Sequence, residues 1–92
     1  MEIVYDKEAL KSLKRYDKTT SARIILGIQG LIQTPPAGDI RQLTGHNNLF
    51  RLRIGKYRVV YEYITQKDEN DNPVTMLFIS DIDSCGDIYR RF

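Results

Sequence analysis

The 92-residue sequence is poor in metal-binding and redox side chains: it has one cysteine, one histidine and no tryptophan. A single cysteine excludes an internal disulfide, and one Cys with one His is too few for a structural zinc site, so we expect no metal and no other cofactor. The chain has no apolar run long enough to span a bilayer, and residues 1–10 lack both the basic and the apolar region of a secretory leader. We therefore expect a cytoplasmic protein with no membrane partner.

The length and composition indicate one small domain over residues 1–92. Hydrophobic residues make up 41% of the chain and charged residues 28%, as in ordinary globular proteins, and the net charge is only +2. The charge is unevenly distributed, however. Residues 1–58 contain eleven Lys or Arg against five Asp or Glu, whereas residues 59–92 contain three against seven. A domain polarised in this way can present a basic surface suited to nucleic acid.

The first third of the chain predicts a short strand and two helices. Residues 1–5 alternate in polarity, and Asp6 is a good N-cap for a helix with Ala9, Leu10 and Leu13 on its apolar face. A second helix begins near residues 19–24 and ends before Pro35. We expect it to be capped by Thr19, Thr20 or Ser21, and its buried stripe to contain Ile25, Ile28 and Ile32 with Ile24 and Leu31 alongside.

The remainder of the chain predicts strands. Residues 34–48 are turn-rich, residues 51–63 form a hairpin, residues 65–73 are a polar, acidic loop, and residues 74–80 are apolar without alternation, as in a central strand. The order is strand, two helices, then three strands (βααβββ). This order predicts an α+β fold in which a small, mostly antiparallel sheet packs one face on an N-terminal helical hairpin and leaves the other partly open.

The hairpin "RLRIGKYRVVYEY" has an apolar face and a cationic face. Gly55-Lys56 fits a two-residue type II′ loop, with Gly at its first position. In that register Arg53 lies directly opposite Arg58, Arg51 lies one step along and Lys56 lies at the tip. The apolar face then contains Phe50, Leu52, Ile54, Tyr57, Val59 and Tyr61.

The cationic face needs an explanation because like charges directly opposite each other destabilise a sheet. One interpretation is a solvated face on which the arginines pair with Glu62 or with acidic loop residues. The other is an anion site, since a guanidinium binds two phosphate oxygens at once and stays charged. A phosphate backbone such as that of RNA fits this second interpretation, and we expect exposed arginines that contribute little to folding stability.

Two segments carry a resemblance to a known family. The runs "LTGHNNLFRLRIGKYRVVYEY" and "FISDIDSCGDIYRRF" resemble the RelE/ParE superfamily of toxins from bacterial type II toxin–antitoxin systems, on the RelE side. The resemblance implies a small antiparallel sheet on a helical hairpin. It also implies metal-independent cleavage of mRNA in the ribosomal A site, by attack of a ribose 2′-hydroxyl on the adjacent phosphate.

The resemblance also implies roles for individual residues. It places the basic catalytic residues of the first hairpin strand at Arg51 and Arg53, the phosphate-stabilising arginine at Arg58, and the tyrosine that stacks on the substrate base at Tyr89. We expect further RNA contacts from Lys56, Arg90 and Arg91.

The sequence departs from the RelE pattern at two points. RelE has lysines where this chain has Arg51 and Arg53, and an arginine is a very poor general base, which leaves His46 and Glu62 as candidates. Relatives commonly carry Arg at the position of Cys85, and a thiol cannot replace a guanidinium. Cys85 therefore predicts a weakened or inactive toxin.

Two alternatives to an mRNA endonuclease remain open at this point. One is a ParE-like inhibitor that binds DNA gyrase and cleaves nothing; the other is a catalytically inactive partner that binds the antitoxin and acts as a corepressor. The clustered arginines favour the endonuclease, because a protein-binding inhibitor does not need a phosphate clamp. The resemblance implies a cognate antitoxin as partner, and contact with operator DNA only through the antitoxin complex.

Overall fold

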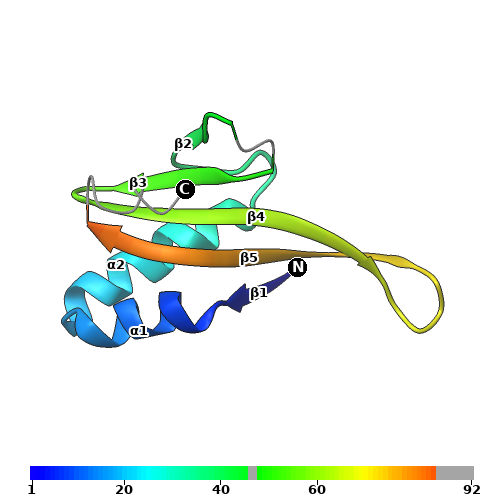
Figure 1. The fold of residues 1–92 in the computed structure, drawn as a ribbon, viewed down its shortest axis with the longest axis horizontal. Coiled ribbons are helices and arrows are strands. Elements are labelled where there is room, and N and C mark those ends of the chain that lie inside the picture. The colour runs from blue at the N-terminus through cyan, green and yellow to red at the C-terminus, as the bar shows by residue number, and fades with distance from the viewer. Residues whose placement is uncertain (46–47, 85–92) are drawn as a thin grey trace.

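A five-stranded sheet carries the fold, with the helices packed on one of its faces (Figure 1). The computed structural model describes residues 1–45 and 48–84. The strands are ordered β1-β5-β4-β3-β2, with β1 parallel to β5 and the other neighbours antiparallel, which confirms the predicted α+β class. In chain order the elements are β1 (Glu2–Tyr5), α1 (Lys7–Arg15), α2 (Lys18–Gln29), the 3₁₀ turn η1 (Gly30–Ile32), β2 (Asp39–Gln42), β3 (Phe50–Ile54), β4 (Tyr57–Lys67) and β5 (Pro73–Ser84).

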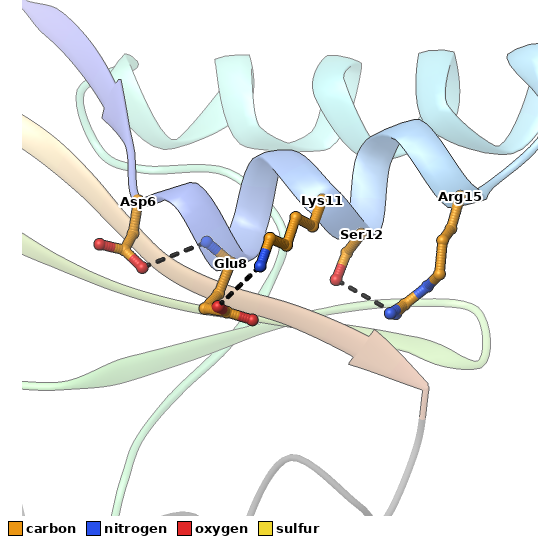
Figure 2. Close-up of polar contacts among 5 residues, drawn as sticks. All are labelled: Asp6, Glu8, Lys11, Ser12 and Arg15. Carbon is orange, nitrogen blue, oxygen red and sulfur yellow. Dashed lines mark hydrogen bonds and ion pairs between the residues drawn. The ribbon is translucent and has the colours of Figure 1, made fainter.

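Both helices begin at an aspartate. Asp6 caps α1 as predicted, and its carboxylate accepts a hydrogen bond from the Glu8 amide at 3.3 Å (Figure 2). Asp17 caps α2 and accepts from the Thr20 amide at 2.7 Å. The expected caps Thr19, Thr20 and Ser21 are therefore wrong, because α2 begins earlier, at Lys18.

The buried faces of the helices differ by a small rotation from those predicted. Ala9 and Ser12 are the buried residues of α1, whereas Leu10 is exposed. In α2 and η1 the buried side chains are Ile24, Ile28 and Leu31, while Ile25 and Ile32 are exposed. Residues 24–32 contain more apolar side chains than one helical face can bury, so spacing alone does not decide which stripe faces the sheet.

The hairpin of β3 and β4 has the predicted register. Ile54 pairs with Tyr57, and Arg53 pairs with Arg58. Gly55 has a φ of +58° and Lys56 is not in the positive-φ region, as a type II′ turn requires. The short edge strand β2 lies inside the segment expected to be only turns, and this additional strand is a correction to the βααβββ order.

The core lies between the helices and one face of the sheet. Strand β5 is an interior strand, between β1 and β4, as predicted, but the helices cover only one of its faces. Within the described ranges no helix is long and apolar enough to cross a membrane. The fully buried cluster contains Ala9, Ile24, Ile28, Leu31, Leu52, Val59, Tyr61, Leu77, Ile79 and Ile82.

Candidate functional site

The face of the sheet opposite the helices carries a row of four charged residues across four strands. Leu52 and Val59 point into the core, so their neighbours Arg53 and Arg58 lie on the other face. The ladder pairs Asp39 with Arg53, Arg53 with Arg58, and Arg58 with Asp83. The two predicted arginines therefore lie directly opposite each other, and an aspartate lies at each end of the row.

Arg51 lies in the next row and is buried, with 9% of its surface exposed. Its Nη1 atom donates to the backbone carbonyl of Asp39 at 3.0 Å and lies 3.2 Å from the Asp39 carboxylate. The expectation that Arg51 is exposed is wrong, because β2 lies against β3 and supplies these partners. Arg51 thus links β3 to β2 through Asp39.

Arg58 is half-buried, and its Nε and Nη1 atoms are enclosed by the protein. The register places it between Arg53 and Asp83, so a carboxylate on one side offsets the cation on the other. The prediction that Arg58 is exposed is therefore wrong, whereas its small contribution to folding stability stays a prediction.

Arg53 and Lys56 are exposed near the β3–β4 turn. The Nε of Arg53 donates to the Gly55 carbonyl at 3.3 Å. The Lys56 ammonium lies 5.5 Å from the centre of the Tyr57 ring, within the range of a cation–π interaction. Of the three hairpin arginines, Arg53 is the most accessible to a ligand.

The remaining candidates lie elsewhere. Glu62 is half-buried on the same face as Arg58, opposite Phe78 on β5. His46, Cys85, Tyr89, Arg90 and Arg91 lie outside the described residues. Among residues 1–45 and 48–84 no group of three His, Cys, Asp or Glu side chains is arranged to hold a metal ion.

Sequence reasoning missed the carboxylates of this face. Asp81 and Asp83 alternate along β5, so both lie on the face of the arginines, and Asp81 is buried with its Oδ1 accepting from the Ile82 amide at 2.9 Å. The spacing of two between Asp81 and Asp83 was a usable signal. Together with Asp39 and Glu62, they make this face a mixed array of both charges. We call residues Asp39, Arg41, Arg51, Arg53, Arg58, Glu62, Asp81 and Asp83 the outer face.

Tyr61 and Tyr63 of β4 do not supply a base. Burial raises the pKa of both Tyr61 and Tyr63, so their hydroxyls stay protonated at neutral pH. Both rings pack in or against the core, and the Tyr63 hydroxyl donates to the Leu31 carbonyl at 2.7 Å. The chemistry that the outer face itself can perform is therefore anion binding and electrostatic stabilisation by fixed guanidinium groups.

Comparison with known proteins gives one family and several similar folds. The family model described as the ParE toxin of the type II toxin–antitoxin system parDE matches residues 3–87. A search of curated proteins gives no match.

Three solved complexes contain a chain of similar fold. In the RelB–RelE antitoxin–toxin complex from Methanococcus jannaschii the similar chain is 24% identical, with 97% of this chain and 98% of that chain covered and a TM-score of 0.66. In the RelBE2 complex of Mycobacterium tuberculosis the similar chain is 19% identical, with 90% of this chain and 95% of that chain covered and a TM-score of 0.64. In the intact RelBE complex of E. coli the similar chain is 16% identical, with 92% of this chain and 96% of that chain covered and a TM-score of 0.66.

Proposed function

The chain belongs to the ParE toxin family of type II toxin–antitoxin systems, within the RelE/ParE superfamily, and from this premise we propose that it is a toxin that cleaves mRNA in the ribosomal A site. The observation that carries the proposal is the placement of Arg53 directly opposite Arg58 on the outer face. Asp39 and Asp83 flank this pair and offset part of its repulsion, while the guanidinium of Arg53 is exposed to solvent and accessible to an anion. A phosphate group of RNA is an anion that guanidinium groups bind with two oxygens at once.

The proposed reaction needs no metal. The 2′-hydroxyl oxygen attacks the adjacent phosphorus and loses its proton to a base, while the bond from phosphorus to the 5′-oxygen breaks and that oxygen takes up a proton. The pentacoordinate phosphate carries extra negative charge in the transition state. Arg53 and Arg58 would stabilise this charge, and Arg51, which is tied to Asp39, would hold the hairpin face in position.

The other roles in the proposal are assigned to residues that the resemblance or the sequence singles out. Tyr89 would stack on the substrate base, Lys56, Arg90 and Arg91 would contact the RNA backbone, and the base would be Glu62 or His46. Cys85 occupies the position at which relatives carry an arginine, so we expect the reaction to be slowed at the departure of the 5′-oxygen.

We also propose a cognate antitoxin as partner. The similar folds were solved in toxin–antitoxin complexes, which supports this proposal. The outer face combines cations with carboxylates, so an amphipathic segment with acidic residues would bind over Arg53 and block RNA. Contact with operator DNA would then be made through the antitoxin.

The test is cleavage of mRNA in a translation reaction assembled from purified components. The exposed Arg53 is the informative position, because Arg53→Ala removes a cation without removing a buried contact. Lys11→Ala is the matched control, since Lys11 is an exposed cation on α1, on the other side of the sheet. We expect a cut at the A-site codon, at least tenfold slower with Arg53→Ala and unchanged with Lys11→Ala. Cys85→Arg should accelerate the cut.

A second candidate function is inhibition of DNA gyrase, which the match to the ParE family model favours. In that case the arginines of the outer face would have structural or partner-binding roles, as the burial of Arg51 illustrates. Supercoiling by purified gyrase, measured with and without the toxin, tests this candidate. Inhibited supercoiling with intact mRNA would replace our proposal.

A further inference from the structure

Helix α2 packs against strand β3, and Gly27 of the helix lies beside the Ile54 side chain at the end of the strand. A Cβ atom added at Gly27 would lie 2.5 Å from Cδ1 of Ile54, so any larger residue there would require the Ile54 side chain to shift. Arg23 lies one helical turn before Gly27 and therefore on the same side of α2. A Cβ atom added at Gly55 would lie 2.9 Å from Nη2 of Arg23, so the guanidinium is beside the β3–β4 turn.

The β3–β4 turn thus has cations from three parts of the chain around it. Arg23 approaches from α2, Arg53 donates from β3 to the Gly55 carbonyl, and Lys56 is in the turn itself. All three side chains are exposed. Because Arg53 also belongs to the outer face, the positive charge continues from that face around the turn to α2.

An open groove on α2 begins at Arg23. It is lined by Lys18, Thr19, Ala22, Arg23 and Leu26. Leu26 is 70% exposed, the highest value among the exposed large hydrophobic residues of the described chain. The sequence of α2, KTTSARIILGIQ, contains no acidic residue. The groove therefore combines an apolar surface with two cations, and the carboxylate nearest to them in the sequence, that of the N-cap Asp17, accepts from the Thr20 amide.

We propose that this groove on α2 binds a nucleotide of the RNA strand that flanks the nucleotide at the outer face. Arg23 and Lys18 would bind its phosphate, and the face of the base would lie on the side chains of Leu26 and Ala22. This inference rests on the proposed function for the presence of RNA at the outer face.

Two observations favour RNA as the occupant. The first is charge: a nucleotide is an anion joined to an apolar ring, which matches a groove of apolar side chains beside two cations. The second is continuity, because Arg23 and Arg53 both lie beside Gly55, so a strand bound at Arg53 would pass the turn to Arg23 and from there continue along α2 into the groove.

The test is an NMR titration of the full chain, labelled at its backbone amides and at its Leu and Ala methyl groups, with a single-stranded oligoribonucleotide; the amides report on the outer face and the methyl groups on the groove. We expect the Leu26 and Ala22 methyl signals to shift, while those of the buried Leu77, away from the groove, stay in place. Shifts confined to the outer face would overturn the groove as a binding site and leave the outer-face proposal standing. An absence of any shift would overturn both.

Variants test the role of the cations. Removing one phosphate contact lowers the slope of log Kd against log salt by about one. We expect this change for Arg23→Ala and for Lys18→Ala, together with weaker binding, and none for Lys11→Ala, which lies on α1 outside the groove. An unchanged slope in both groove variants would overturn the phosphate site. If the Leu26 and Ala22 signals shift but mRNA is not cleaved, the groove stands as an RNA-binding site and the proposed reaction is rejected.

Discussion

Arg51 and Arg53 lie two residues apart on one strand, but we expect the removal of Arg51 to lower the free energy of unfolding far more than the removal of Arg53. Arg51 is buried and its Nη1 binds both the carbonyl and the carboxylate of Asp39, at 3.0 and 3.2 Å. Arg53 is exposed, donates one hydrogen bond to Gly55 at 3.3 Å and lies opposite Arg58. Arg51→Ala therefore removes a fixed contact between strands, whereas Arg53→Ala removes a repulsion.

The magnitude follows from the partners. A hydrogen bond to a charged group contributes about 1.5–3 kcal/mol, and the stem of a buried arginine adds packing. The carboxylate of Asp39 is 55% exposed, so the ion pair itself contributes no more than about 1 kcal/mol. We expect Arg51→Ala to lower the free energy of unfolding by about 2–3 kcal/mol. Asp39→Asn should lower it by less than about 1 kcal/mol, because the backbone carbonyl remains as acceptor.

The assay is urea denaturation of the purified chain, supported by thermal melting. In a domain of this size about 1 kcal/mol shifts Tm by about 4–8 °C, so Arg51→Ala should melt at least about 8 °C lower. Arg53→Ala should stay within about 0.5 kcal/mol of the unmodified chain. Equal stabilities of the two variants would refute our assignment of a structural role to Arg51. They would also make Arg51 as direct a probe of RNA binding as Arg53.

Three further predictions concern the scaffold. Gly55→Ala places a Cβ at a φ of +58° and should lower the free energy of unfolding by about 1–2 kcal/mol, measured by urea denaturation. An unchanged free energy of unfolding would show that the turn needs no glycine. Tyr63→Phe removes the 2.7 Å hydrogen bond to the Leu31 carbonyl and should lower the free energy of unfolding by about 1 kcal/mol. The same loss should be measured when Tyr63→Phe is combined with a substitution at a distant site, because distant effects add. Hydrogen bonds from Thr20 lower the pKa of Asp17 below 3.8, so its contribution is complete above that pH and disappears as the pH falls through the lowered pKa. The stability gap between the unmodified chain and Asp17→Ala should therefore narrow in acid, and a gap that stays constant from neutral pH to below that range would contradict this cap.

The hairpin was predictable from the sequence because two independent signals agree on it. The alternation of apolar residues fixes which face is buried, and Gly55 fixes the loop, so a register slip by one residue would expose the whole apolar face. The placement of Arg53 opposite Arg58 follows from the same register. The class of the fold followed from the order of helices and strands.

The phase of α2 and the burial of Arg51 could not be predicted, for different reasons. Ile24 and Ile25 are both apolar, and only contact with the sheet decides that Ile24 is buried. Arg51 is buried because Asp39 on β2 binds it, and β2 is four residues long within a segment rich in Pro and Gly. A strand that short leaves no periodic signal, so its partner side chain was missed with it.

The measurement that tests the central claim most directly is the fate of mRNA and of supercoiled DNA in parallel reactions with one toxin preparation. Purified ribosomes translating a defined mRNA receive the unmodified chain, Cys85→Arg, Arg53→Ala or Lys11→Ala, and the 5′ ends of the fragments are mapped. We predict a cut within the A-site codon that Cys85→Arg accelerates, Arg53→Ala slows at least tenfold and Lys11→Ala leaves unchanged, with gyrase unaffected. Uncut mRNA with all four proteins, alongside inhibited gyrase, would contradict the account.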